Sequence, residues 1–276
     1  MHSSTASTAD PLTRFLPGAR PRRIAHRGLS PEGAENTLAA FGAALEAGAD
    51  LLETDVRATA DGVAWLLHDE TLQRIAQDPR PVAELTGAQM REVRVAGIEP
   101  VSRLEDALGE FPDAQFNIDV KVPEAIASTV TAIARTGSAE RICLTSFHGS
   151  VAADAVARVQ AATGILPARS PSRGAMAAFL AARALELPAA CLARLLAPYG
   201  ALQVPPRYPY SSRWAVPIVT EANIAAAHRA GVEVHVWTVD ETAAMRDLLV
   251  SGVDGIITNR VDLLTELLEG TAPTTR

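Results

Sequence analysis

The alternation of short β-like runs with helical stretches constrains the fold of this chain more than any other feature of its sequence. The β-like runs recur from about residue 22 onward, and apolar-periodic helical stretches separate them. Strands that alternate with helices predict a parallel sheet covered by helices. Eight such units in roughly 250 residues are typical of a (β/α)8 barrel. We therefore expect an α/β protein with a single (β/α)8 TIM barrel, and the alternative is a doubly wound open sheet.

Apolar periodicity and helix start and stop signals place the expected elements. The first helix should begin near Asn36 and Thr37, which suit its cap, and end at Gly48. The strands are expected at 23–26, 51–57, 115–121, 142–147, 164–167, 201–204, 232–239 and 255–258. The helices are expected at 37–47, 123–135, 151–161, 175–197, 221–230 and 242–250. We expect a disordered or loosely packed tail over residues 1–22 and one barrel domain over residues 23–270.

Composition and charge exclude several classes of protein. Of the 276 residues, 48% are hydrophobic and 21% are charged, which is ordinary for a globular chain and argues against extensive disorder. The formal net charge of −7 argues against a nucleic-acid-binding protein, whose phosphate contacts need a basic surface. An anionic small molecule is compatible with this charge only where a metal ion or a few Lys and Arg side chains reverse it locally.

The cysteines and the apolar stretches indicate in which cellular compartment the protein is expected. The two cysteines, Cys143 and Cys191, have no CxxC spacing, and this usage suits a reducing compartment. Charged residues interrupt the longest apolar tract, 174–202, and the first twenty or so residues lack the apolar run of a signal peptide. We expect a cytoplasmic protein without a membrane anchor. Whether it has an oligomeric partner is not indicated by the sequence.

Acidic side chains occur within predicted strands, both faces of which should be buried. Glu53 and Asp55 are two residues apart in one strand, and Asp119 and Lys121 in another, so each pair should project to one face. Buried unpaired carboxylates would cost several kcal/mol each. A divalent cation held by the three acids would remove this cost, and an all-oxygen ligand set favours Mg²⁺ or Ca²⁺ over zinc. The alternative is a satisfied polar layer in which Lys121 pairs with the acids.

Histidines and an arginine are expected at the same end of the barrel. His26 and Arg27 close the first strand, and His68 follows the short apolar run 63–67, so all three should lie at the C-terminal rim. Two imidazoles can divide the proton work of a reaction, while Arg27 and Lys121 can offset the charge of a phosphate. Taken alone, each histidine is more often a hydrogen-bonded structural residue. The convergence of these groups with the three acids favours catalysis.

An ordered series of short motifs runs through the chain. Its main members are Ile-Ala-His-Arg-Gly (24–28), Glu-Asn-Thr-Leu-Ala-Ala-Phe (35–41), Glu-Thr-Asp-Val (53–56), Leu-His-Asp-Glu (67–70), Asp-Val-Lys (119–121), Val-Trp-Thr-Val (236–239) and Gly-Val-Asp-Gly-Ile-Ile-Thr-Asn (252–259). Over about residues 23–266 the series resembles the glycerophosphodiester phosphodiesterases, and among them the bacterial cytoplasmic type.

The resemblance implies a (β/α)8 barrel that hydrolyses glycerophosphodiesters to glycerol 3-phosphate and an alcohol. The resemblance implies that Glu53, Asp55 and Asp119 bind one divalent cation, Mg²⁺ or Ca²⁺, and that His26 and His68 are the acid–base residues. It also implies that Arg27 and Lys121 contact the phosphate and that Trp237 lies near the glycerol end of the pocket. The segment 35–37 is expected to brace the loop and cap the first helix rather than take part in the chemistry.

The chain departs from the family's pattern at several positions. Asp119 stands where the third metal ligand is usually Glu. Asn259 stands where Asp is common, and Asp240 where Asn is common. The sequence leaves open which histidine is the acid, whether a cyclic phosphate forms, and which alcohol leaves.

We therefore expect metal-dependent hydrolysis of a small-molecule glycerophosphodiester by acid–base catalysis with two histidines. One alternative is a lysophospholipase D or phospholipase D-like phosphodiesterase on the same barrel, which a long apolar loop or a membrane anchor would favour. A second alternative is an inactive barrel that binds phosphate or polyols. Loss of a histidine or of a metal-binding acid would favour it, and the sequence retains all of these residues.

Overall fold

Strands and helices alternate along the computed structural model, which describes residues 15–16, 18–209 and 215–270. The barrel strands are β1 (Arg22–His26), β2 (Leu51–Ala58), β6 (Phe116–Val120), β7 (Ile142–Thr145), β8 (Ala168–Arg169), β9 (Ala201–Val204), β12 (Glu233–Val236) and β13 (Gly255–Thr258). The main helices are α2 (Leu38–Glu46), α5 (Leu104–Glu110), α6 (Ile126–Thr136), α7 (Gly149–Thr163), α8 (Arg173–Ala184), α9 (Ala189–Leu196), α10 (Glu221–Arg229), α11 (Thr242–Val250) and α12 (Val261–Gly270).

Shorter elements lie in the connections. Between β2 and α5 the chain forms β3 (Ala64–Leu66), α3 (Gln73–Ala76), η1 (Val82–Glu84), α4 (Gly87–Arg91), β4 (Arg94–Val95) and β5 (Glu99–Pro100). Elsewhere it forms η2 (Pro123–Ala125), η3 (Ala139–Arg141), β10 (Arg207–Pro209) and β11 (Ala215–Pro217). Within the described ranges, no helix combines the length and the hydropathy needed to cross a lipid bilayer.

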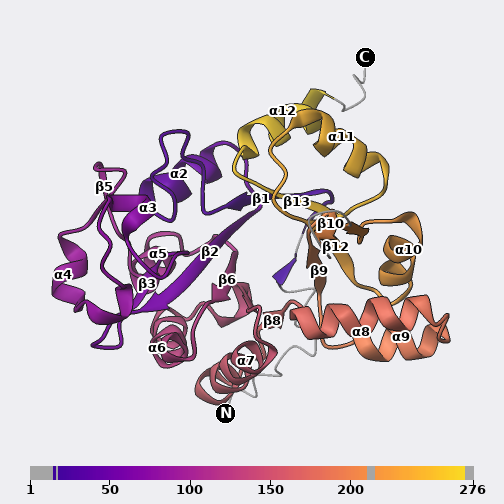
Figure 1. Ribbon diagram of the computed structural model, residues 1–276, viewed down its shortest axis with the longest axis horizontal. Coiled ribbons are helices and arrows are strands. Elements are labelled where there is room, and N and C mark those ends of the chain that lie inside the picture. The colour runs from indigo at the N-terminus through magenta and orange to yellow at the C-terminus, as the bar shows by residue number, and fades with distance from the viewer. Residues whose placement is uncertain (1–14, 17, 210–214, 271–276) are drawn as a thin grey trace, which may run out of the picture.

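The barrel strands form a nearly closed ring with helices around it (Figure 1). Their order is β8–β7–β6–β2–β1–β13–β12–β9, and every neighbouring pair is parallel, so the first and last strands of the chain lie side by side. At the seam between β8 and β9, the Gly200 amide donates to the Arg169 carbonyl at 3.3 Å, and the Ser170 hydroxyl donates to the Ala201 carbonyl at 3.3 Å. This topology confirms the predicted (β/α)8 barrel.

Several elements differ from the expected ones. The strand expected at 164–167 begins only at Ala168, because Gly164 ends α7 in the left-handed conformation, with φ 75°. The single helix expected over 175–197 is divided into α8 and α9, since Pro188 at the start of α9 cannot continue a helix. The sequence patterns predicted neither α5, which precedes β6, nor α12, which follows directly after β13.

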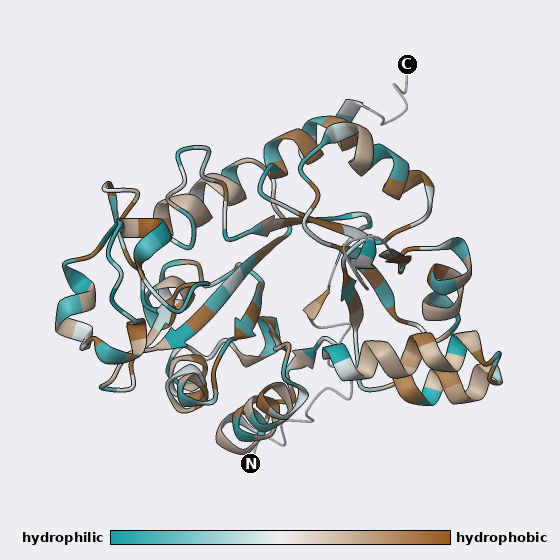
Figure 2. Cartoon of the chain, viewed as in Figure 1, coloured by the Kyte–Doolittle hydropathy of each residue, from teal (hydrophilic) through white to brown (hydrophobic). Residues whose placement is uncertain are grey.

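The side chains inside the barrel are apolar at one end, which we call the floor, and polar at the C-terminal ends of the strands, which we call the rim. The floor is one buried cluster formed by Phe15, Leu16, Ile24, Leu51, Cys143, Ala168 and Ile257. Two residues beyond Ile24 and Leu51 stand His26 and Glu53, which share their faces because side chains alternate along a strand. Figure 2 shows that hydrophobic and hydrophilic residues follow one another along β2. The polar groups therefore collect at the C-terminal ends of the strands.

The N-terminal segment contributes to this floor. Phe15 and Leu16 fall within the predicted loose tail, yet their side chains are only 2% and 7% exposed. The Arg22 guanidinium donates to the Leu16 carbonyl at 2.8 Å, which ties this segment to the start of β1. Residues 1–14 and 17, on which most of that prediction rests, lie outside the described residues.

A buried ionic network surrounds Glu233 at the N-terminal end of the barrel. The Glu233 carboxylate lies 3.0 Å from Arg22, 2.9 Å from Arg20 and 2.9 Å from the His235 Nε2 atom. Burial alone would raise the pKa of Glu233, but the hydrogen bonds from His235 and Arg22 lower it to about 2. The network therefore favours the ionised carboxylate and stabilises the fold.

Glu233→Gln is expected to lower the free energy of unfolding by about 3 kcal/mol at pH 7, because it leaves buried Arg22 facing an uncharged partner. The folded-state pKa of about 2 lies below the ordinary value of 4.5. The contribution is therefore complete above about pH 5 and lost as the pH falls toward 2. In urea denaturation, the difference between wild type and variant should shrink to less than half by about pH 3.

The exposed Glu110 provides the control, and Glu110→Gln should change the free energy of unfolding by less than about 0.5 kcal/mol throughout. A Glu233→Gln difference that is equal at pH 7 and pH 3 would show that Glu233 does not stabilise through its charge.

Candidate active site

A polar pocket of about 180 Å³ opens at the C-terminal ends of the barrel strands. Strand pairing aligns its residues, because His26 is the register partner of Glu53, and Asp55 is the register partner of Asp119. All eight site residues expected from the sequence line this pocket, namely His26, Arg27, Glu53, Asp55, His68, Asp119, Lys121 and Trp237. The structure thus brings the predicted residues together, from segments up to about two hundred residues apart.

A tight turn after β1 positions Arg27. Arg27 and Gly28 both have positive φ, 58° and 85°, which is unusual for the non-glycine residue. Gly28 is required here, because a Cβ atom at this position would lie 2.7 Å from the backbone of Ala40. The Arg27 amide donates to the Glu53 carbonyl at 2.9 Å, so the turn is fastened to β2. Backbone strain of this kind is typical of functional sites.

Asp55 is the most fully paired acid of the pocket. The Lys121 Nζ atom lies 2.7 Å from one of its oxygens, and the Arg27 Nε atom lies 2.9 Å from the other. The Asn36 side-chain amide donates to the same carboxylate at 3.3 Å. Burial opposes ionisation, but Lys121 and Arg27 outweigh it and lower the pKa of Asp55. The alternative to a metal site that the sequence left open, a polar layer in which Lys121 pairs with the acids, is therefore partly present.

Glu53 and Asp119 are less well compensated. Burial, followed by the charge of Asp55, raises the pKa of Glu53 well above its ordinary value, and burial also raises the pKa of Asp119. The Asp119 Oδ2 atom pairs with Lys121 at 2.5 Å, while its buried Oδ1 atom has no hydrogen-bond partner among the described residues. Among the residues that the structure describes, no three or more His, Cys, Asp or Glu side chains are arranged closely enough to hold a metal ion. The orphaned oxygen and the raised pKa values nevertheless fit a site that takes additional positive charge.

His68 is held by a carboxylate. Its Nδ1 atom lies 2.6 Å from Asp69, whose second oxygen accepts from the Arg74 Nε atom at 2.6 Å. Arg74 in turn donates to both oxygens of Glu35, at 2.9 and 2.7 Å, and Glu35 pairs with Arg27 at 3.0 Å. The sequence reasoning missed Asp69 and Arg74, although Asp69 directly follows His68 in the Leu-His-Asp motif. Glu35 braces the loop as expected, and it also connects His68 to Arg27.

His26 is held by an amide instead. Its Nδ1 atom lies 2.7 Å from the Asn259 Oδ1 atom, and the Asn259 Nδ2 atom donates to Asp240 at 2.8 Å. The two departures from the family pattern, Asn259 and Asp240, are therefore in contact. Burial, followed by the charge of Arg27, lowers the pKa of His26, and its Nε2 atom lies 3.9 Å from Glu53.

An aromatic pair and a glutamine complete the pocket. The rings of Phe147 and Trp237 meet edge to face with their centroids 6.2 Å apart, and Lys121 lies 5.5 Å from the Phe147 centroid. The Gln203 Oε1 atom accepts from Asn117 at 3.1 Å, while its buried Nε2 donor has no partner within the part of the chain that the structure describes. Phe147, Asn117 and Gln203 were not predicted. Gln203 and Asn117 carried a signal as polar residues within otherwise apolar strands, and Phe147 and Gln203 lie in segments, 144–147 and 202–205, that share in the family resemblance.

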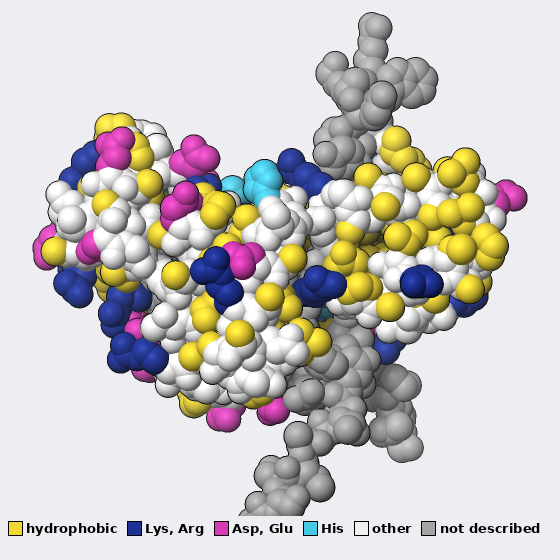
Figure 3. All heavy atoms as spheres, turned by 90° about the horizontal axis from the view of Figure 1, so that it is seen from below, with side chains coloured by type: hydrophobic (Ala, Val, Ile, Leu, Met, Phe, Trp, Pro, Cys, Tyr) yellow, Lys and Arg dark blue, Asp and Glu magenta, His cyan; other side chains and the backbone are white. Residues whose placement is uncertain are grey.

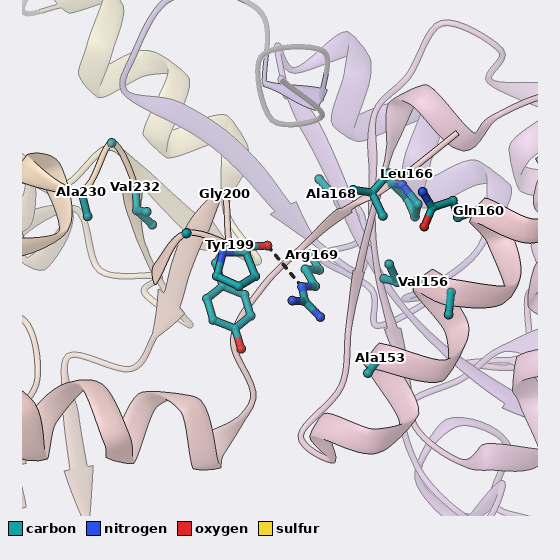
Figure 4. Close-up of a pocket in the computed structure, with 15 residues that line it drawn as sticks. Ala153, Val156, Gln160, Leu166, Ala168, Arg169, Tyr199, Gly200, Ala230 and Val232 are labelled. Atoms are coloured by element: carbon teal, nitrogen blue, oxygen red, sulfur yellow. Dashed lines mark hydrogen bonds between the residues drawn. The ribbon is translucent and has the colours of Figure 1, made fainter. Parts of the chain in front are cut away.

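A second hollow, of about 410 Å³, lies at the seam between β8 and β9 (Figure 4). Side chains of α7 form one side of it, and Tyr199, Gly200 and Val232 lie on the other. The Arg169 guanidinium lies over the Tyr199 ring, 5.2 Å from its centroid. No histidine or carboxylate lines this hollow, so it lacks the acid–base groups of the polar pocket.

Comparisons with known sequences identify one family of similar proteins. The sequence model of the "Glycerophosphoryl diester phosphodiesterase family" matches residues 26–263. A Mycobacterium tuberculosis protein described as "Probable glycerophosphodiester phosphodiesterase 2" is 36% identical over 262 residues, which are 94% of each chain. A glycerophosphodiester phosphodiesterase of Caldanaerobacter subterraneus is 28% identical over 261 residues, 89% of this chain and 96% of that protein.

Solved structures share the fold. A glycerophosphodiester phosphodiesterase of Agrobacterium tumefaciens is 25% identical with a TM-score of 0.66, and the match covers 90% of this chain and 98% of that one. An Oleispira antarctica phosphodiesterase, solved in complex with its product sn-glycerol-3-phosphate, is 20% identical with a TM-score of 0.68. That match covers 91% of this chain and 97% of the Oleispira chain.

Proposed function

Because this chain belongs to the glycerophosphoryl diester phosphodiesterase family, we propose that its polar pocket hydrolyses glycerophosphodiesters to glycerol 3-phosphate and an alcohol. One observation carries the proposal. Two imidazoles, each fixed through Nδ1 by a different partner, line one pocket together with three carboxylates, an arginine and a lysine. These are the groups that proton transfer and phosphate binding require.

We propose that Glu53, Asp55 and Asp119 hold one divalent cation, Mg²⁺ or Ca²⁺. Three acids line the pocket but only two permanent cations do, Arg27 and Lys121, so with the acids ionised and the histidines neutral its formal charge is negative and would repel a phosphodiester anion. A divalent ion would reverse that net charge, and the all-oxygen donor set suits Mg²⁺ or Ca²⁺. When bound, such an ion polarises a phosphoryl oxygen and offsets developing negative charge.

The hydrogen-bond partners of the two histidines suggest which one accepts a proton and which one donates a proton. We propose that His26, whose Nδ1–H donates to the neutral Asn259 amide, keeps a free Nε2 lone pair and accepts the proton of the attacking hydroxyl. His68 faces the Asp69 carboxylate, which stabilises the imidazolium, so His68 gives its proton to the leaving alcohol. A new oxygen–phosphorus bond forms as the bond from phosphorus to the alcohol breaks, and Arg27 and Lys121 offset the phosphate charge.

Asp69→Asn is expected to lower kcat on glycerophosphocholine by about ten- to a hundredfold, because an amide no longer stabilises protonated His68. A leaving group of low pKa needs no acid, so the loss on the p-nitrophenyl ester of glycerol phosphate should be less than about threefold. Steady-state kinetics on both substrates measures this difference. Asp78→Asn, at an acid that pairs only with nearby Arg80, should leave both rates unchanged. Equal losses on both substrates would contradict the assignment of His68 as the acid.

A panel of substrates tests the proposed function as a whole. Glycerophosphocholine, glycerophosphoethanolamine and glycerophosphoglycerol should each yield glycerol 3-phosphate, whereas dimethyl phosphate, which lacks glycerol, should be hydrolysed far more slowly. Absence of glycerol 3-phosphate with every member of the panel would overturn the proposal and favour a binding barrel.

A further inference from the structure

Arg74 contacts two acids beside the polar pocket, Glu35 and Asp69. Its Nη1 and Nη2 atoms donate to the two oxygens of Glu35 at 2.9 and 2.7 Å, and its Nε atom donates to Asp69 at 2.6 Å. Each acid also contacts a second side chain, because Glu35 pairs with Arg27 at 3.0 Å and Asp69 lies 2.6 Å from the His68 Nδ1 atom. Arg74 itself lies outside the residues that line the pocket, whereas Arg27 and His68 both line it. One side chain outside the pocket thus connects the partner of Arg27 to the partner of His68.

Buried residues nearby hold the Arg74 backbone in place. Arg74 lies on the short helix α3, and Leu72 and Ile75 on either side of it are 0% and 7% exposed within one buried cluster. The Ile75 carbonyl also accepts from the Ala96 amide at 2.7 Å, which fastens α3 to the residue that follows β4. A planar guanidinium on a fixed backbone can hold its acceptors in one defined geometry.

The exposure of these side chains argues against a role in stability alone. The side chains of Arg74, Asp69 and Glu35 are 47%, 28% and 23% exposed. Ion pairs with this exposure contribute little to the free energy of unfolding, because water screens their charges. The contacts of Arg74 do fix the directions of two carboxylates, and each carboxylate is a partner of a side chain in the pocket.

Ion pairs as such do not indicate a function at this end of the molecule. Figure 3 shows basic and acidic side chains interspersed over the end that carries α3 and α4. The pair of Arg80 and Asp78, for example, lies in the connection after α3, and neither residue lines the polar pocket. The contacts of Arg74 differ from this pair because they lead through one further residue to Arg27 and to His68.

Removal of the Arg74 charge would leave two carboxylates without a shared partner. Burial opposes ionisation of both acids, but hydrogen bonds from Arg74 to Glu35, and from His68 and Arg74 to Asp69, lower the pKa of each. Both carboxylates are therefore charged in the folded protein. Without Arg74, Glu35 would draw Arg27 toward itself, and Asp69 could turn away from His68.

We propose that Arg74 is a positioning residue for the hydrolysis, acting through Asp69 on His68 and through Glu35 on Arg27. The inference rests on the proposed function, in which His68 protonates the leaving alcohol and Arg27 binds the phosphate. The contact with Asp69 fixes the orientation of the imidazole, and the contact with Glu35 fixes that of the Arg27 guanidinium. The two effects are separable, because proton transfer to the alcohol appears in kcat and binding of the phosphate appears in KM.

Arg74→Gln tests both effects in the full-length protein. On glycerophosphocholine, kcat should fall by about tenfold or more, because His68 is no longer held for proton transfer. On the p-nitrophenyl ester of glycerol phosphate, which needs no acid, kcat should fall by less than about threefold. KM should rise by about threefold or more on both substrates, because Arg27 is less well oriented toward the phosphate. An equal loss of kcat on the two substrates, or an unchanged KM on both, would overturn the proposal.

The variants Asp69→Asn and Glu35→Gln isolate the two effects. Asp69→Asn should reproduce only the loss of kcat on glycerophosphocholine, and Glu35→Gln should reproduce only the rise in KM. Combined with Arg74→Gln, neither should add its full effect, because residues that act through one contact are not additive. Full multiplication of the single effects in both double variants would show that Arg74 does not act through these acids, and the proposal would fail.

Two further variants separate positioning from charge and from stability. Arg74→Lys keeps the charge but not the planar set of donors, so it should resemble Arg74→Gln, and wild-type kinetics of Arg74→Lys would contradict the positioning role. Arg80→Gln breaks an exposed pair with Asp78 that does not lead to the pocket, and it should change neither kcat nor KM. In urea denaturation, Arg74→Gln and Arg80→Gln should unfold at similar midpoints. A large loss of stability in Arg74→Gln alone would assign Arg74 a structural role instead.

Two measurements without turnover separate this inference from the proposed function. In calorimetric titration with glycerol 3-phosphate and Mg²⁺, Arg74→Gln should bind at least about threefold more weakly than the wild type. Nitrogen-15 chemical shifts at about pH 8.5, where an ordinary imidazole is neutral, should place the His68 proton on Nδ1 in the wild type and partly on Nε2 in Arg74→Gln. If neither quantity changes, the role of Arg74 is overturned even in an active enzyme. If both change but the wild type releases no glycerol 3-phosphate, the proposed function fails and the role of Arg74 in holding both side chains is supported.

Discussion

His26→Ala is expected to lower kcat on glycerophosphocholine by about 10²- to 10⁴-fold, the contribution typical of one general base. His26 is the only proposed acceptor for the proton of the attacking hydroxyl, and its ring is fixed in the pocket by Asn259. KM should change much less, because Arg27 and Lys121 still bind the phosphate. Because the variant leaves space where the ring stood, added imidazole should restore part of the rate, and this rescue would not occur if His26 were only structural.

His148 provides the control for this variant. It is an exposed histidine just beyond β7, and His148→Ala should keep at least half of the wild-type rate. Unchanged urea denaturation would show that His26→Ala is folded. A folded His26→Ala enzyme with more than about a tenth of the wild-type kcat would contradict its role as the base.

Glu53→Gln is expected to lower kcat/KM by about 10²- to 10³-fold and to raise the concentration of Mg²⁺ or Ca²⁺ needed for half-maximal activity by at least about tenfold. The amide keeps the shape of the side chain but removes the charge proposed to bind the cation. Glu70→Gln, at an exposed acid nearby, should change neither quantity.

The same variant should have the opposite effect on stability. Burial and the neighbouring Asp55 raise the pKa of Glu53, so without a bound cation this carboxylate destabilises the fold when ionised. In buffer with EDTA at pH 8, the melting temperature of Glu53→Gln should equal or exceed that of the wild type. A large loss of both activity and stability would indicate a structural role for Glu53. A loss of activity with an unchanged metal requirement would indicate that Glu53 acts as an acid rather than as a ligand.

The fold was predictable because its main signal is local. The alternation of strands and helices and the capping of α2 by Thr37, whose hydroxyl accepts from the Ala40 amide at 3.2 Å, are encoded by adjacent residues. The hairpin β10–β11 and the strands β4 and β5 were missed, because strands of two or three residues have too few positions to show a period. The division between α8 and α9 was missed for a different reason, since the single Pro188 was outweighed by the apolar periodicity around it.

The placement of the candidate site was also predictable. The i, i+2 spacing of Glu53 and Asp55 and of Asp119 and Lys121 brings the four side chains to one pocket once the strands pair in parallel. The roles of these residues stay predictions, which the variants above test.

The partners of the two histidines could not be predicted in the same way. Asn259 lies more than two hundred residues from His26 in the sequence, and only the pairing of β1 with β13 brings them together. Residues of α8, β9 and β11 likewise line one apolar groove next to this pocket, and no local pattern records that they come together.

One measurement tests the central claim most directly: the products formed from glycerophosphocholine by the wild-type protein, with Mg²⁺ or Ca²⁺ and then with excess EDTA. The proposed mechanism predicts equimolar glycerol 3-phosphate and choline, loss of both in EDTA, and recovery when the divalent ion is restored in excess. Release of phosphocholine and glycerol, or a rate unaffected by EDTA, would contradict it.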